Sequence, residues 1–183
     1  MELTDGLAES LMRTVMRNSH ILMEDPGNYD ARAEVMWAGS LSHNGLTGCG
    51  TDGGDWATHR LEHELGGMFD VAHGAGLAAV WGSWARYVYQ EEPEKFAQFA
   101  VQVMGVPADA GTAEETALAG IRAMEDFFRS IGMPTSLREL GAVPTEEQMK
   151  EMAQKCVFFG RRTVGGFRVL HAEDIEAIYR MAL

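Results

Sequence analysis

Helix signals recur along almost the whole chain, and the alternation of apolar and polar residues that marks a strand is nearly absent. An apolar stripe with helical spacing follows a candidate N-cap at Thr4 or Asp5. The segment from Gly166 to Leu170 is the single weak strand candidate. The pattern predicts an all-α domain of about seven to nine helices.

Capping signals predict where several of these helices begin and end. The Asp25-Pro26-Gly27-Asn28 stretch is expected to end the first helix, because proline and glycine do not continue one. The other signals are Asp30 as the cap of a second helix, Pro93 in a first turn, the capping boxes Thr112–Glu115 and Thr145–Gln148, and a last helix from about Ala172 to Met181.

Composition excludes several classes of function. A chain of 183 residues suits a single domain, and its formal charge of −12 argues against a surface that binds DNA or RNA. Cys49 and Cys156 form no CxxC pattern, so a disulfide framework or a zinc finger is not expected. No signal peptide and no apolar stretch long enough for a membrane span is found. We therefore expect one cytoplasmic domain over residues 1–183, without nucleic-acid or membrane partners.

Half of the six histidines lie between residues 55 and 74. His59 and His63 are four apart, so one helical face would present both rings, and His73 follows after two glycines. Neutral imidazole is the commonest side-chain metal ligand, but the zinc-protease motif HExxH fails because position 67 is glycine. In one straight helix His59 and His73 would be about 21 Å apart. A shared metal requires the chain to fold back, and Gly66 and Gly67 offer a place for this.

Two further sequence features, a glycine-rich segment and His43, do not by themselves indicate a function. Gly48, Gly50 and Gly53 match the nucleotide-binding spacing GxGxxG, but the preceding segment is helical, so a loop between helices is expected. His43 suits either an interaction at a helix end or the wall of a pocket.

Taken together, these segments resemble the iron-containing (group III) alcohol dehydrogenase family, and in particular its butanol dehydrogenase branch. The resemblance covers essentially the whole chain, and its histidine motif is specific. It is carried by residues 25–38, by Ser42-His43-Asn44-Gly45-Leu46, by Asp55-Trp56-Ala57-Thr58-His59, by His63-Glu64-Leu65, by residues 69–78 and by the tail with Ile131-Gly132-Met133-Pro134-Thr135.

The resemblance implies an all-α domain like the carboxy-terminal domain of the dehydroquinate synthase-like fold. It implies that His59 and His73 bind a divalent metal, iron or zinc. His63 would line the cleft near the nicotinamide, with a catalytic role as proton relay or in positioning and with contact to the cofactor. The family's other two ligands, an aspartate and a histidine three residues apart, precede the region matched here. The Rossmann-like domain that mainly binds NAD(P) is likewise expected outside residues 1–183.

The function implied is part of an alcohol dehydrogenase that interconverts a small primary alcohol and an aldehyde. Its partners would be that substrate, the missing nucleotide-binding domain and a second copy in a homodimer, and the isolated chain is expected to be inactive. One alternative is a stand-alone helical scaffold or interaction protein with a vestigial metal site. A second alternative is a helical metalloprotein that recruits ligands across a dimer.

Overall fold

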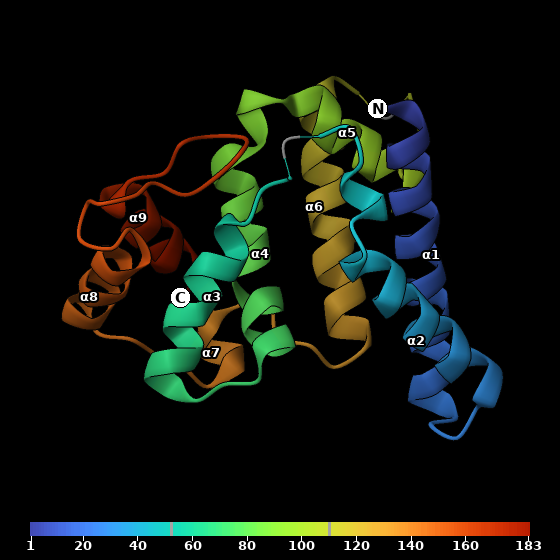
Figure 1. The fold of residues 1–183 in the computed structure, drawn as a ribbon, viewed down its shortest axis with the longest axis horizontal. Coiled ribbons are helices and arrows are strands. Elements are labelled where there is room, and N and C mark those ends of the chain that lie inside the picture. The colour runs from blue at the N-terminus through green and yellow to red at the C-terminus, as the bar shows by residue number, and fades with distance from the viewer. Residues whose placement is uncertain (52, 110) are drawn as a thin grey trace.

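The computed structural model describes residues 1–51, 53–109 and 111–183, and these ranges contain nine α-helices (Figure 1). The helices are α1 (Glu2–Glu24), α2 (Tyr29–His43), α3 (Ala57–Phe69), α4 (His73–Val88), α5 (Pro93–Gln102), α6 (Ala113–Ser130), α7 (Leu137–Leu140), α8 (Glu146–Cys156) and α9 (Ala172–Ala182), with short 3-10 helices η1 (Leu46–Gly48) and η2 (Tyr89–Glu91). The predicted all-α fold is confirmed. Within the same ranges, no helix has the length and apolar character needed to cross a bilayer.

The predicted strand near Gly166 is wrong. Among the described residues only an isolated antiparallel bridge occurs, in which Val164 and Leu170 exchange two backbone hydrogen bonds. The residues between them form a turn, and Gly165 has a φ of 101°. A turn inside the segment leaves no room for a paired strand.

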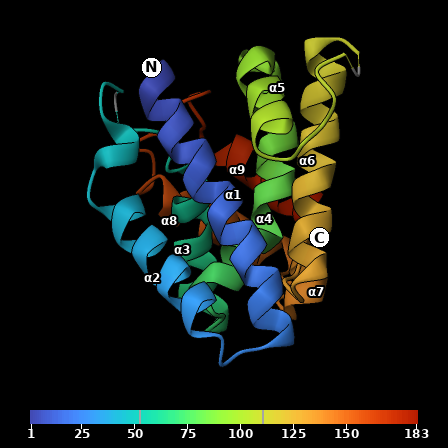
Figure 2. The same ribbon diagram turned by 90° about the vertical axis from the view of Figure 1, so that its right-hand side faces the viewer.

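Helix α4 lies at the centre of the molecule and packs against α3, α6, α7 and α9 (Figure 1). Its second half is buried on nearly all sides, which its small residues Ala78, Ala79, Gly82 and Ala85 permit. Helices α1 and α2 form a hairpin at one side, and Figure 2 shows α5 and α6 standing beside it. The helix pair α3–α4 lies between α8 and α9 on one side and the α1–α2 hairpin on the other (Figure 1).

The core fixes α3 against the carboxy-terminal helices. Leu61 and Leu65 of α3 and Ile175 and Tyr179 of α9 are fully buried in one cluster. The Tyr179 hydroxyl donates a hydrogen bond of 2.7 Å to the Leu61 carbonyl oxygen. Burial raises the pKa of Tyr179 well above its usual value, so the hydroxyl remains a donor. These contacts hold the face of α3 that is opposite its histidines.

The two capping boxes, at Thr112 and Thr145, are confirmed at the starts of α6 and α8. The predicted caps at the start of the chain are wrong. Helix α1 begins at Glu2, ahead of both residues. The Thr4 hydroxyl donates to the Cys49 carbonyl and Asp5 accepts from the Lys95 ammonium, so neither side chain acts as a cap. For α2 the cap is the Asn28 side chain, which accepts from the Ala31 amide, two positions before Asp30. The Pro93 start, the break after Glu24 and the last helix agree with the predictions.

Two glycines in helix interiors are expected to respond to alanine with opposite signs. A Cβ at Gly120 of α6 would lie 2.7 Å from the Ala100 Cα of α5, so Gly120→Ala should push the two helices apart and cost about 1–3 kcal/mol. A Cβ at Gly39 of α2 meets nothing within 4 Å, so Gly39→Ala should stabilise the fold by up to about 1 kcal/mol. Urea unfolding of both variants tests this, and equal effects at the two positions would contradict the close approach of α5 and α6.

A second prediction concerns pH and the start of α9. The Asp174 carboxylate accepts hydrogen bonds from the His171 amide (2.8 Å) and the Tyr87 hydroxyl (2.7 Å), with Arg168 nearby. Burial alone would raise the pKa of Asp174, but these partners outweigh it and lower the pKa below its ordinary 3.8. The carboxylate therefore stabilises the fold above about pH 4, and this contribution is lost as the pH falls through the lowered pKa.

We expect Asp174→Asn to destabilise the chain near neutral pH and to do so less as the pH drops towards about 3. Thermal unfolding of both proteins between these limits measures the difference. A difference that stays constant over the whole range would show that the charge of Asp174 contributes nothing.

Candidate metal centre

The three histidines of the cluster lie on the consecutive helices α3 and α4: His59 in the first turn of α3, His63 one turn later, and His73 at the start of α4. Helix α3 runs uninterrupted through Gly66 and Gly67, so the predicted break at these glycines is wrong. The chain reverses three residues later, at Asp70, whose φ of 52° places it in the left-handed region. Aspartate tolerates this conformation better than most residues, because its short side chain bonds locally. The reversal brings His73, the first residue of α4, back against α3.

All three imidazole rings converge, as a shared site requires. The ring centroids of His59 and His73 are 5.4 Å apart and those of His63 and His73 are 5.6 Å apart. The His59 and His63 centroids are 6.5 Å apart. Metal–nitrogen bonds of about 2 Å place the ring centres of two ligands of one tetrahedral ion about 5 Å apart. Both pairs that include His73 fit this spacing better than the HxxxH pair does.

A buried carboxylate, which the sequence analysis missed, completes the cluster. Glu62 lies between the two histidines of α3 with a side chain only 3% exposed, and it contacts His73 Nδ1. One donor atom from each of Glu62, His63 and His73 lies within 4.8 Å of the others. The available signal was a glutamate three residues after His59 on a helix rich in histidine. Its burial could not be read from this spacing.

The surroundings of His59 favour a neutral ring. Partial burial is the largest cause that lowers the pKa of His59, and the neighbouring His73 and His63 lower this pKa further. Trp56 packs edge-on against the same ring at a centroid distance of 4.8 Å. The neutral form is the one that binds a metal, so the cluster presents a ligand-ready imidazole at neutral pH.

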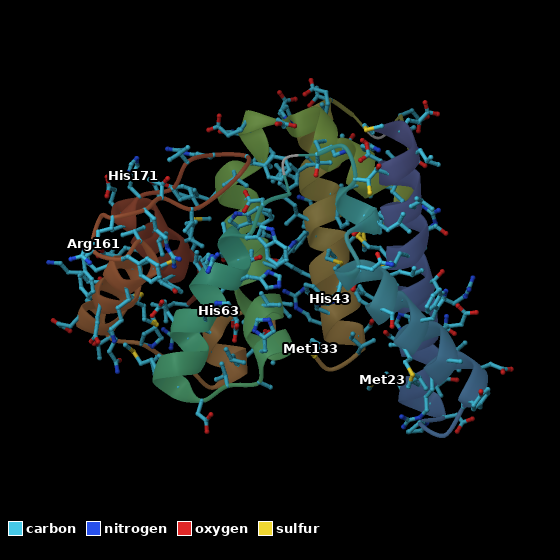
Figure 3. All side chains as sticks on the ribbon, viewed as in Figure 1. Met23, His43, His63, Met133, Arg161 and His171 are labelled. Atoms are coloured by element: carbon cyan, nitrogen blue, oxygen red, sulfur yellow. The ribbon has the colours of Figure 1, made fainter. Side chains whose placement is uncertain are left out.

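Two cavities meet at His59. One, of about 860 Å³, is the more polar of the two and is bordered by the loop between α2 and α3. His43 lines this cavity, and its ring also contacts the Gly39 carbonyl oxygen, so both expectations for His43 hold. The other, of about 470 Å³, is almost wholly apolar and extends past Trp81 to Met133. Figure 3 marks His63 on α3, with His43 and Met133 towards the α2 and α6 side. Within the cluster, His59 thus borders both a cavity of mixed polarity and an almost wholly apolar one.

The loop that borders the 860 Å³ cavity follows α2, as predicted, and no strand precedes it in the described residues. Asp52, inside the GxGxxG match, lies outside the described residues. Asp55 fixes the far end of the loop by accepting from the amides of Ala57 (2.7 Å), Gly166 (2.7 Å) and Phe167 (3.1 Å). This clamp ties the first turn of α3, and with it His59, to the carboxy-terminal loop.

The chain is similar to known enzymes over its full length. A family model described as the carboxy-terminal part of the Fe-containing alcohol dehydrogenase family matches residues 1–183. NADH-dependent butanol dehydrogenase A of Clostridium acetobutylicum is 35% identical over 177 residues, which are 96% of this chain and 44% of that protein. NADPH-dependent aldehyde reductase YqhD of Escherichia coli is 35% identical over 140 residues, covering 76% of this chain and 35% of the reductase.

Solved structures agree with these relatives. The crystal structure of NADH-dependent butanol dehydrogenase A from Thermotoga maritima superposes with a TM-score of 0.90 at 34% identity, over 99% of this chain and 46% of that one. Escherichia coli YqhD gives a TM-score of 0.91 at 30% identity, over 100% and 46%. The chain therefore spans less than half the length of these relatives. It belongs to the iron-containing alcohol dehydrogenase family and corresponds to that family's carboxy-terminal, all-helical part.

Proposed function

We propose that this chain is the helical, metal-binding part of an NAD(P)-dependent alcohol dehydrogenase. The reaction converts a small primary alcohol and NAD(P)⁺ into an aldehyde, NAD(P)H and a proton, or runs in reverse. The observation that carries the proposal is the convergence of the His59, His63 and His73 rings, with His59 bordering two cavities. The names of the relatives, butanol dehydrogenase and aldehyde reductase, support this substrate class.

His59 and His73 are the proposed ligands of a divalent ion, iron or zinc. Their rings have a separation suited to one ion, and the lowered pKa of His59 favours the neutral ring, in which one of the two nitrogens has a free lone pair. When bound, such an ion supplies Lewis-acid polarisation of the substrate oxygen. His63 lies 5.6 Å from His73, ring centre to ring centre, and we assign it contact with the nicotinamide and the transfer of the hydroxyl proton.

The remaining parts of the enzyme are proposed to lie outside residues 1–183. The nucleotide-binding domain and further metal ligands would complete the site, because a catalytic metal normally has three protein ligands. By itself the chain is expected to bind metal weakly and to be inactive. Its two thiols are unpaired, which supports the proposed cytoplasmic location, where thiols stay reduced.

Two assays test the proposal. Metal titration of the wild-type chain, His59→Ala and His63→Ala separates a ligand from a relay, since only His59→Ala should weaken binding. Oxidation of NADH or NADPH by butanal is then measured for the chain alone and for the chain assembled with the nucleotide-binding domain. The assembled, metal-loaded pair should be active, and the His63→Ala pair should keep its metal but turn over more slowly. Failure of the assembled wild-type pair would refute the dehydrogenase assignment.

A stand-alone interaction protein is the second candidate, and homodimers are compatible with either. It is favoured by exposed apolar side chains on α2, where Tyr29 and Met36 lie on one face and are 81% and 75% exposed, next to Trp37 at 62%. Static light scattering of the chain tests it. A dimer at micromolar concentration is expected, and a strictly monomeric chain would remove both the homodimer and this candidate.

A further inference from the structure

The carboxylate of Glu62 is placed where a charged side chain is rarely found. Glu62 lies on α3 among the histidines, yet its side chain is only 3% exposed and it sits between α3 and α4. Removing a carboxylate from water costs several kcal/mol unless a partner compensates. The site must therefore give this group a specific partner.

That partner is the ring of His73. The Glu62 carboxylate contacts His73 Nδ1 across the junction of the two helices. A carboxylate only accepts hydrogen bonds, so the nitrogen it contacts must carry the proton. In a neutral imidazole the other nitrogen, Nε2, then has a free lone pair and is the atom that can bind a metal. The His73 side chain is 52% exposed, so a ligand can reach the ring.

The backbone of both helices leaves room for this carboxylate. A Cβ at Gly76 of α4 would lie 2.7 Å from the Glu62 Cγ, and a Cβ at Gly66 of α3 would lie 3.2 Å from its Oε1. Gly67 and Gly74, on the same two helices, have nothing within 4 Å of a Cβ. The absence of a side chain at positions 66 and 76 thus makes room for the Glu62 side chain, and not for a close approach of the two helix backbones.

We propose that Glu62 is a positioning residue of the metal centre. It accepts the Nδ1 proton of His73, fixes the ring in the Nδ1–H tautomer with Nε2 as the donor, and increases the basicity of that donor. The proposal rests on the assignment of His73 as a ligand in the proposed function. Glu62 itself is not assigned contact with the metal or the substrate.

The first test needs no metal. The tautomer of His73 is read from nitrogen–proton correlation NMR of the full chain, at a pH about two units above the ordinary histidine pKa of ~6.5. The wild-type chain should contain the Nδ1–H form of His73, and Glu62→Gln should lose this preference. Glu64→Gln, the same substitution two residues along α3, should leave the tautomer unchanged. An unchanged tautomer in Glu62→Gln would overturn the proposal.

The second test measures the affinity of the same variants for Zn²⁺ and Co²⁺. Loss of a hydrogen bond that orients a ligand typically weakens metal binding about 10–100-fold. Glu62→Gln should therefore bind each ion about 10–100-fold more weakly than the wild type, and Glu64→Gln should bind like the wild type. Wild-type affinity in Glu62→Gln would overturn the positioning role even if the tautomer changes. A wild-type chain that binds neither ion would instead overturn the metal site, while the tautomer measurement still decides whether Glu62 orients His73.

A third variant guards against misfolding of Glu62→Gln. Gly76→Ala keeps the carboxylate but displaces it, so it should shift the tautomer and weaken metal binding in the same direction. Gly74→Ala, two residues earlier in α4, gains the same methyl group in open space and should behave like the wild type. Equal metal affinity and tautomer in the two alanine variants would count against the role of Glu62.

Discussion

Replacing His73 by alanine is expected to weaken divalent-metal binding by at least about 100-fold, beyond the 10–100-fold typical of a residue that only supports a ligand. His73 is one of the two proposed ligands, and its ring centre lies 5.4 Å from that of His59, a spacing that suits one ion. The change also leaves the Glu62 carboxylate buried without its partner. Calorimetric or absorption titration with Zn²⁺ and Co²⁺ measures the loss.

The matched control is His20→Ala. His20 is an exposed histidine of α1 that packs edge-on against Phe127 and lies outside the cluster. This variant should bind metal like the wild type, which excludes a general effect of losing one imidazole. If His73→Ala and His20→Ala bind metal equally well, then the cluster between α3 and α4 is not the metal centre.

The Arg86→Met variant is expected to lose about 3–5 kcal/mol of stability. The Arg86 guanidinium of α4 makes two parallel hydrogen bonds of 2.6 Å to the Glu125 carboxylate of α6, whose side chain is 9% exposed. Hydrogen bonding to Glu125 raises the pKa of Arg86, so the guanidinium stays charged at any ordinary pH. Methionine keeps an unbranched apolar stem but leaves a buried carboxylate unpaired. Denaturant unfolding at neutral pH measures the change.

The double variant Arg86→Met/Glu125→Met separates the charge from the packing. Replacing both members of a buried ion pair by apolar side chains of similar volume is often neutral or stabilising. We therefore expect the double variant to recover most of the stability that Arg86→Met loses. A double variant as unstable as the single one would mean that packing around Gly82, which the Glu125 carboxylate approaches closely, dominates over the unpaired charge.

Local signals in the sequence were sufficient for most of the helices. The capping boxes at Thr112 and Thr145 act within four residues of chain, so their chemistry does not depend on the rest of the fold. The predicted caps at Thr4 and Asp5 are wrong: the helix begins before them, and their side chains bond to the distant residues Cys49 and Lys95. A side chain that has both a local and a distant partner cannot be assigned from spacing alone.

For the histidine cluster too, some features follow from the local sequence and others from tertiary contacts. Sequence spacing determined that His59 and His63 share a helical face and that His73 follows within reach only if the chain turns back. Tertiary structure decided that the turn is at Asp70, that the three rings converge, and that Glu62 is buried against His73. The physical reason is that periodicity fixes direction along one helix, whereas burial and contact between α3 and α4 depend on how two helices pack.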